Sequence, residues 1–262
     1  MSIATELQNL NDNILDAYTA VGNKGGSIPA QKNTANLDTA IGSIPAAPEA
    51  YIPLAVNAIS NTLEKPSTSF TWSAPSSASI IGDYALAFAF CQSGVTSVDF
   101  NNVTTINTYG LNKAFNGCSN LTSVDLSNLT TVDSNGLNNA FEGCSNLTSV
   151  DLSNLAVVDS GGLVAAFRGC TSLTTMSFDN VSSIGPYGFQ GAFNICSNLT
   201  TVSFPALTTS SFGTSTNQFD SMLLGCTGVT VHFPAAIAST IGPWSSVRNG
   251  FGGTNTILQF DL

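Results

Sequence analysis

A block of about 26 residues recurs along this chain, and this periodicity constrains the fold more than any other feature. Three successive blocks read LNKAFNGCSNLTSVDLSNLTTVDSNG, LNNAFEGCSNLTSVDLSNLAVVDSGG and LVAAFRGCTSLTTMSFDNVSSIGPYG. A unit of this length cannot bury its own apolar face and therefore needs a neighbour on each side. The sequence predicts a repeat solenoid with a parallel β-sheet face, in which successive coils stack on one another.

Each block contains one predicted strand, whose side chains alternate between the two faces of the sheet. In the segment LTSVDL, Val124 and Leu126 point inward, whereas Ser123 and Asp125 point outward. The same register in the other blocks gives one inward set on the strands and a second set after the next corner. These sets are Val98, Phe100, Val150, Leu152, Met176, Phe178, Val202 and Phe204 on the strands, then Leu129, Leu155, Val181 and Leu207.

Each block also ends in a phenylalanine and a cysteine that the repeat places in two inward columns. Adjacent strands lie about 4.8 Å apart with parallel side-chain directions, whereas disulfide-linked Cβ atoms lie about 3.8 Å apart and converge. We therefore expect a column of buried thiols rather than disulfides. The predicted columns are Phe88, Phe115, Phe141, Phe167 and Phe193, and Cys91, Cys118, Cys144, Cys170, Cys196 and Cys226.

The outward strand face carries rows of carboxylates and hydroxyls, and it is the candidate ligand-binding surface. Two interpretations stay open: a solvated polar sheet copied by duplication, or a surface that accepts hydrogen bonds from a receptor. The aspartate row alone motivates the hypothesis of a calcium site, because calcium prefers oxygen ligands. No other cofactor or metal is expected. The candidate residues are Asp99, Asp125, Asp151, Ser123, Ser127, Ser149, Ser153, Ser177 and Asp179.

A further row of asparagines recurs at one corner of the repeat. Asn102, Asn128, Asn154 and Asn180 are predicted to form a hydrogen-bonded ladder that satisfies backbone groups. Glycines recur at other corners, as at Gly117 and Gly136, where tight turns or positive φ angles are the expected cause.

Composition and motifs argue against several function classes. The chain has 16 acidic and 6 basic side chains and a formal net charge of −10, a surface that repels nucleic acid. No apolar run is long enough to span a membrane. The chain has one histidine, His232, in an alternating strand-like segment, and no nucleophile elbow or phosphate-binding glycine loop accompanies it. We expect a non-enzymatic protein.

The first 45 residues differ from the repeats and predict a helical module for attachment or oligomerisation. An apolar seam with alternating spacings of four and three residues contains Ile3, Leu7, Leu10, Ile14, Ala17 and Val21. A second short amphipathic helix is predicted between two prolines. The pair forms either an intrachain hairpin or a parallel homo-oligomer, for which a trimer is one arrangement. Residues 46–65 are predicted to be a linker, and residues 66–262 are predicted to be the solenoid with a cap at each end. The first cap contains Phe70 and Trp72, and the last contains Trp244, Phe251 and the segment TILQF.

The pattern L..V.L, followed by a bend containing Val or Ile and then AF..C, resembles the BspA-like leucine-rich repeats of bacterial surface proteins over residues 66–235. That resemblance implies a bacterial surface adhesin or protein-interaction module. The amino terminus, MSIATELQNLND, lacks the basic and apolar pattern of a secretion signal, and no wall anchor is seen.

Residues 1–45 are similar to amino-terminal segments of tail-fibre and tail-tip proteins in phages of Gram-positive bacteria. This second resemblance implies a virion protein that is assembled in the host cytoplasm and contacts other tail or baseplate proteins through its amino terminus. The repeats would then display a surface for a bacterial receptor, either protein or glycan. The alternative is a BspA-like adhesin at the bacterial cell surface.

Overall fold

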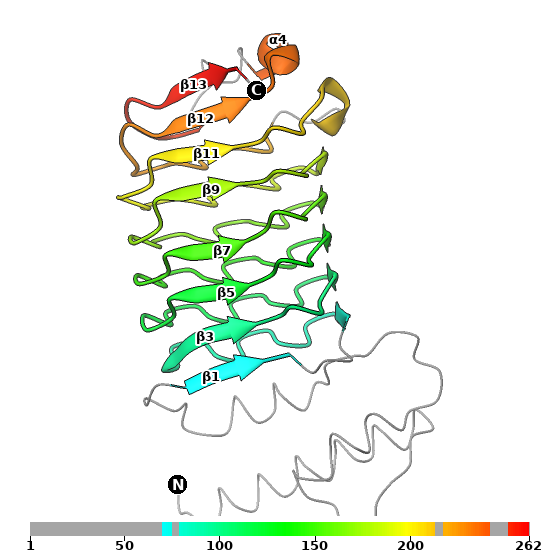
Figure 1. Ribbon diagram of the computed structural model, residues 1–262, viewed down its shortest axis with the longest axis vertical. Coiled ribbons are helices and arrows are strands. Elements are labelled where there is room, and N and C mark those ends of the chain that lie inside the picture. The colour runs from blue at the N-terminus through cyan, green and yellow to red at the C-terminus, as the bar shows by residue number, and fades with distance from the viewer. Residues whose placement is uncertain (1–69, 75–78, 213–216, 242–250, 262) are drawn as a thin grey trace, which may run out of the picture.

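The computed structural model describes residues 70–74, 79–212, 217–241 and 251–261. Within them the chain winds into a parallel β-solenoid whose coils stack along the long axis of the molecule (Figure 1). The predicted solenoid with a parallel sheet face is therefore confirmed. The predicted helical module of residues 1–45, with its seam at Ile3, Leu7, Leu10, Ile14 and Val21, lies outside the described residues, as does the linker of residues 46–65.

One side of the solenoid, here called the strand face, is built from the longer strands. Their order in space is their order in the chain, and every pairing is parallel. The first four-stranded sheet contains β1 (Phe70–Ser73), β3 (Val95–Asp99), β5 (Ser123–Asp125) and β7 (Ser149–Asp151). The second contains β9 (Thr175–Ser177), β11 (Thr201–Ser203), β12 (Thr230–Phe233) and β13 (Ile257–Phe260).

A second side carries a parallel sheet of two-residue strands, each about one corner after a strand of the first side. These are β2 (Ile80–Ile81), β4 (Thr105–Ile106), β6 (Thr131–Val132), β8 (Val157–Val158) and β10 (Ser183–Ile184). In the next coil a short 3₁₀ helix, η1 (Thr209–Phe212), follows the strand. After β12, η2 (Ala235–Ile237) and α4 (Ala238–Ile241) lie at the carboxy-terminal end.

The third side, here called the turn face, is a succession of turns that no periodicity argument predicted. Successive backbone N–H groups alternate in direction: Asn112 donates to the carbonyl of Tyr109 in its own coil at 3.0 Å, and Lys113 donates to Asn138 of the next coil at 2.9 Å. Every fourth residue has a positive φ, as at Tyr109, Lys113 and Gly117. The backbone groups of this face therefore form hydrogen bonds both within a coil and between coils, although the segment is not a regular strand.

The repeated glycines divide into two kinds. Gly117 and Gly143 have φ angles of +72° and +75°, as the corner argument expected. Gly136 and Gly162 do not have positive φ; instead, a Cβ at Gly162 would lie 2.9 Å from Cγ1 of Val158. At these two positions close packing excludes a side chain.

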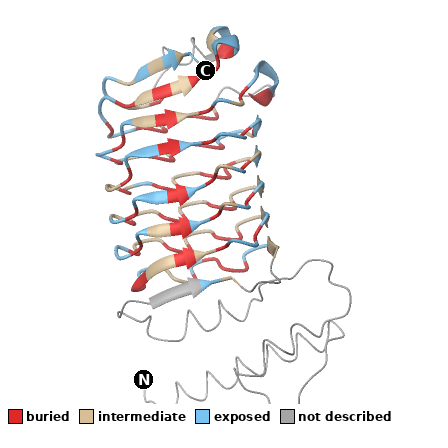
Figure 2. Cartoon of the chain, viewed as in Figure 1, coloured by how far each residue is buried: buried red, intermediate tan, exposed pale blue. Residues whose placement is uncertain are grey.

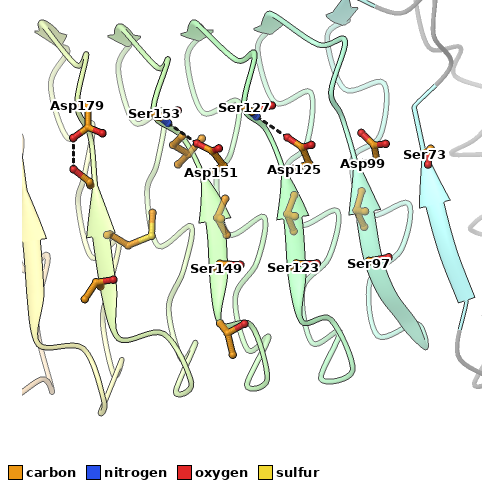
Figure 3. Close-up of a pocket in the computed structure, with 18 residues that line it drawn as sticks. Ser73, Ser97, Asp99, Ser123, Asp125, Ser127, Ser149, Asp151, Ser153 and Asp179 are labelled. Carbon is orange, nitrogen blue, oxygen red and sulfur yellow. Dashed lines mark hydrogen bonds between the residues drawn. The ribbon is translucent and has the colours of Figure 1, made fainter.

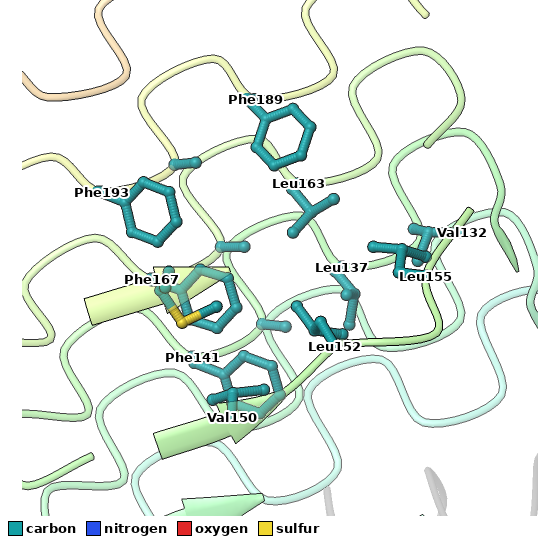
Figure 4. Packing of buried hydrophobic residues seen from close by; sticks show 14 of the residues in the cluster. Val132, Leu137, Phe141, Val150, Leu152, Leu155, Leu163, Phe167, Phe189 and Phe193 are labelled. Atoms are coloured by element: carbon teal, nitrogen blue, oxygen red, sulfur yellow. The ribbon is translucent and has the colours of Figure 1, made fainter. Parts of the chain in front are cut away.

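The core fills the space between the three sides, and the residues predicted to point inward from the strands and after the next corner are all buried (Figures 2 and 4). Phenylalanine rings of successive coils stack, with centroids 5.5 Å apart for Phe115 and Phe141 and 5.6 Å for Phe141 and Phe167. The column begins at Phe90, whose centroid lies 5.1 Å from that of Phe115. The prediction of Phe88 in this column was wrong, because that side chain is 41% exposed on the turn face.

The thiol column is confirmed for five cysteines and corrected at its first member. Cys118, Cys144, Cys170, Cys196 and Cys226 are buried thiols. Each thiol donates to the carbonyl of a phenylalanine in the preceding coil, as from Cys144 to Phe115 at 3.1 Å. Cys91 lies two residues out of register, and Ser93 takes the equivalent position beside Cys118.

The two ends of the described solenoid continue the sheet. β1 pairs with β3, so the predicted strand around Phe70 and Trp72 is confirmed in its backbone. At the other end TILQF forms β13, and Phe251 is 5% exposed and stacks on Phe219 with centroids 5.4 Å apart. Trp244 lies outside the described residues.

Candidate functional site

The strand face is hollowed along the first sheet and β9, and the hollow has a volume of about 1000 Å³ (Figure 3). Parallel pairing puts Ser97, Ser123 and Ser149 in one row and Asp99, Asp125 and Asp151 in the next. The structure therefore brings together the predicted set. All of its members line the hollow: Asp99, Asp125, Asp151, Ser123, Ser127, Ser149, Ser153, Ser177 and Asp179.

The aspartates of this face also end their strands, a role that the sequence argument missed. Oδ1 of Asp125 accepts a hydrogen bond from the backbone N–H of Ser127 at 2.9 Å, and Oδ1 of Asp151 accepts one from Ser153 at 3.0 Å. In the same way, Oδ1 of Asp99 accepts a hydrogen bond from the backbone N–H of Asn101 at 2.8 Å. These are Asx turns, in which the carboxylate replaces a backbone acceptor and fixes the direction of the chain after the strand. The same three aspartates line the hollow.

The row changes at β9, where serine replaces the aspartate. Ser177 donates to the carboxylate of Asp179, and its hydroxyl lies 2.8 Å from that of Ser203 on β11. Asp179 thereby places a carboxylate two residues further along the repeat than Asp151 does, in the row of Ser127 and Ser153. The acidic surface thus extends across β3, β5, β7 and the end of β9.

The face is electronegative because carboxylates line the hollow and, among its described lining residues, none is basic. Within the described residues the lysines and arginines are Lys113 and Arg168, and both belong to the turn face. Arg168 forms an ion pair with Glu142 at 2.5 Å, and Nζ of Lys113 lies 5.6 Å from the ring centroid of Phe88. Like-charged carboxylates about 5 Å apart repel by about 1 kcal/mol in water and by about 3 kcal/mol at an effective dielectric constant of 20.

A family model described as BspA type leucine rich repeat region, in six copies, matches residues 60–191, half of the chain. The chain belongs to the BspA-type leucine-rich repeat family. No curated protein matches the chain. The match begins after residues 1–45, so the resemblance of that segment to phage tail proteins receives no support from it and stays a prediction.

The BspA-type repeats end at residue 191 in the family match, but the geometry continues. β11 pairs with β9 in the register of the earlier coils, and the hydroxyl of Thr200 donates to the carbonyl of Thr174 at 3.0 Å as Thr148 does to Thr122 at 3.1 Å. The asparagine ladder is confirmed for Asn128, Asn154 and Asn180, as in the hydrogen bond from Asn154 to the carbonyl of Ser127 at 2.7 Å. The prediction was wrong for Asn102, which donates to the side-chain oxygen of its neighbour Asn101. The side chains that donate from one coil to the next hold neighbouring coils in register and so keep the rows of the strand face aligned.

Metal binding gains no support from the BspA-type repeat geometry. Within the described residues, no group of three or more His, Cys, Asp or Glu side chains converges to hold an ion. The aspartates of the strand face are spaced along a row, and one oxygen of each is already engaged in an Asx turn. The calcium hypothesis therefore rests on the aspartate row alone.

Several side chains capable of nucleophilic or acid–base chemistry are engaged structurally. Burial raises the pKa of the Cys170 thiol, and it raises the pKa of the Cys196 thiol to about 12. A buried thiol of raised pKa is a poor nucleophile. Nδ1 of His232 lies 3.0 Å from a carboxylate oxygen of Asp261 on the neighbouring strand end. The non-enzymatic character of the protein remains an expectation.

A second group of carboxylates lies at the corner after the two-residue strands. Partial burial, and then the nearby carboxylates of Asp159 and Asp83, raise the pKa of Asp133. Asp159 accepts hydrogen bonds from the hydroxyl of Ser134 at 3.0 Å and from the backbone of Ser160 at 2.7 Å. The repeated motif VDS marks this corner in the sequence, but the group came together only in the structure.

None of the described helices is long and apolar enough to cross a membrane.

Proposed function

We propose that the BspA-type repeats form a non-enzymatic protein-interaction module, an adhesin whose strand face binds a cationic segment of a partner at the bacterial cell surface. One observation carries the proposal. Carboxylates of four successive coils line one hollow, and no basic side chain is among the described residues that line it. A partner with lysine or arginine side chains relieves the repulsion within the row and gains charge-assisted hydrogen bonds.

The geometry suits an extended partner better than a compact ligand. Asp99, Asp125 and Asp151 repeat once per coil along the solenoid axis, with hydroxyls in the adjacent rows. Because the ladders fix these groups before binding, little conformational entropy is lost on the side of this protein. A segment lying along the axis meets the same arrangement in each coil.

The test replaces Asp99, Asp125 and Asp151 together by asparagine in the full-length chain. Asparagine keeps an oxygen for each Asx turn and removes only the charge. Binding to an immobilised lysine-rich peptide is measured by biolayer interferometry, with a glutamate-rich peptide as reference. We expect the substitutions to weaken binding by about tenfold or more. Wild-type binding should also weaken with salt, because surface charges are screened over about 8 Å at physiological ionic strength.

A matched variant carries Asp83→Asn, Asp133→Asn and Asp159→Asn. It undergoes the same change in net charge at the other corner of the repeat, outside the hollow. We expect it to bind the peptide as the wild type does. Equal weakening by both variants would show attraction by net charge alone and would contradict a site on the strand face.

The tail-tip role predicted from residues 1–45 and the adhesin role place the protein in different fractions of a culture, so its location distinguishes them. Peptide mass spectrometry is applied to phage particles purified by density from an induced culture, and to its cell-wall and cytosolic fractions. Enrichment at the wall supports the adhesin. Enrichment in particles together with tail proteins supports the virion component.

A further inference from the structure

The turn face of the first two coils carries aromatic side chains at positions where the fold does not require them. Tyr84, Phe88 and Tyr109 all have positive φ, at 57°, 60° and 56°. Left-handed backbone is unfavourable for bulky residues and is adopted far more easily by glycine and asparagine. We call Tyr84, Phe88, Tyr109 and Lys113 the aromatic cluster.

The backbone hydrogen bonds establish which residues of later coils are equivalent to the cluster. The N–H groups of Tyr84, Tyr109, Asn135 and Gly161 all donate to the following coil in the same way. Phe88, Lys113, Asn139 and Ala165 form the next such row. Asparagine, glycine and alanine thus fill these positions in the middle coils, with the same positive φ at Asn135 and Asn139.

The cluster also gains little from burial. The side chain of Tyr84 is 51% exposed and that of Phe88 is 41% exposed, whereas the core phenylalanines are fully buried. Tyr84 and Tyr109 stack with centroids 5.0 Å apart and ring planes inclined by 15°. The Lys113 ammonium, 5.6 Å from the centroid of Phe88, makes a cation–π contact that helps to orient this ring. Strained backbone combined with exposed, mutually oriented rings indicates a binding surface.

We propose that the aromatic cluster binds a neutral saccharide. Each pyranose ring has an apolar C–H face, which packs on an aromatic ring, and a rim of hydroxyls, which need hydrogen-bonding partners. The same turns of the two coils carry such groups: the phenol hydroxyls, exposed Asp83 and Gln92, and half-buried Thr108 and Asn112. The cation of the cluster already lies over Phe88. The surface therefore suits a polyhydroxylated ligand without charge, unlike the acidic strand face.

This inference concerns a separate surface and does not rest on the proposed role of the strand face. The hollow of the strand face is lined by residues of the longer strands and their ends, and no member of the aromatic cluster is among them. A protein with both sites would contact a cell-wall glycan and a protein partner through different sides of the solenoid.

The test uses the full-length chain with Tyr84→Asn, Phe88→Asn and Tyr109→Asn combined. Asparagine is the residue that the chain itself places at the equivalent positions Asn135 and Asn139, so the coil keeps its backbone. The probes are cellohexaose, maltohexaose, mannohexaose and chitohexaose, titrated by isothermal calorimetry. We expect at least one to bind the wild type with a Kd in the millimolar range or below, and the variant to bind it about tenfold or more weakly.

Tyr187→Asn is the matched control, because Tyr187 is 43% exposed and has a φ of 58° in a distant coil. It should leave saccharide binding unchanged. Both variants should unfold at or above the wild-type temperature, because strain is removed. The proposal is overturned if no probe binds, if the combined variant binds as well as the wild type, or if Tyr187→Asn weakens binding equally. Binding of a proline-rich peptide, lost in the combined variant while no saccharide binds, would also overturn it, since such peptides dock on aromatic surfaces too.

Discussion

The hydroxyl of Ser93 lies 3.6 Å from the thiol of Cys118, which places a serine, and not Cys91, at the start of the cysteine column. The half-buried Cys91 lies instead on the turn side, with its sulfur 3.9 Å from Oδ1 of Asn116. The cause is the segment ALAFAFCQSG, in which two Ala-Phe pairs offer two alignments two residues apart. Phe90 and Ser93 take the inward positions, and Phe88 and Cys91 are displaced outward.

Thiol labelling distinguishes these two environments. With iodoacetamide near neutral pH, we expect the native protein to be alkylated at Cys91 alone, because the other five thiols are buried and donate to backbone carbonyls. In denaturant all six should react. Mass spectrometry of tryptic peptides gives the site, and Cys91→Ser should abolish the native labelling. Labelling of Cys144 as fast as that of Cys91 would show that the column opens readily.

The thiol column also predicts how stability depends on alkaline pH. Burial raises the pKa of Cys144, Cys170, Cys196 and Cys226 above the ordinary value of 9.0, and that of Cys196 to about 12. In the unfolded chain these thiols lose protons from about pH 9, while in the folded chain they keep them. The unfolded state then binds fewer protons, so the free energy of unfolding falls as pH rises.

The fall begins near pH 9 and continues to about pH 12 for Cys196. Each thiol that stays protonated only in the folded state contributes a loss of about 1.4 kcal/mol per pH unit. Urea unfolding at several pH values between neutrality and this range measures it. Replacing Cys196 by alanine should make the slope shallower. A slope equal to that of the wild type would contradict the assignment of the effect to this thiol.

The sequence was sufficient to predict the solenoid, the inward columns and the polar rows, because duplication repeats each residue environment at a fixed spacing. Val124 is inward for the same reason as Val98 and Val150, and one correct register determines all three. The register failed where the repeat degrades, at Phe88 and Cys91. The turn face was not predicted, because its positive φ angles occur at tyrosine, lysine, asparagine and alanine as well as at glycine. The Asx turns of the aspartates were not predicted either, since the alternating pattern of an outward aspartate is the same whether or not the residue ends a strand.

The correction at the first coil gives a direct stability comparison between two phenylalanines. Phe141 is fully buried between Phe115 and Phe167, so Phe141→Ala should lower the free energy of unfolding by about 3–5 kcal/mol. Phe88→Ala should change it by about 0.5 kcal/mol or less, because Phe88 lies on the surface. Urea denaturation of the two variants measures both values. A large loss of unfolding free energy for Phe88→Ala would show that Phe88 belongs to the core column.

The Asx turns predict that alanine and asparagine differ at the same strand-face position. Asp125→Ala removes the acceptor for the N–H of Ser127 and should lower stability by about 1 kcal/mol. Asp125→Asn keeps an acceptor and should remain within about 0.5 kcal/mol of the wild type. The same urea titration compares them. Equal stability of both variants would mean that the turn is held by the rest of the ladder, and alanine would then be as suitable as asparagine for binding studies.

The apolar seam of residues 1–45 was interpreted either as an intrachain hairpin or as a parallel oligomer, and these predict different molecular masses in solution. Three heptads are marginal for an isolated coiled coil, so a parallel assembly requires interhelical contacts at Leu7 and Leu10. If the seam joins chains, light scattering after size exclusion should give a multiple of 27.0 kDa for the full chain. Deletion of residues 1–45, or the milder Leu7→Gln with Leu10→Gln, should then give a monomer with unchanged strand signal in circular dichroism. A full chain that is already monomeric would contradict the oligomer and favour the intrachain hairpin. Loss of the strand signal on deletion would instead make the segment part of the amino-terminal cap.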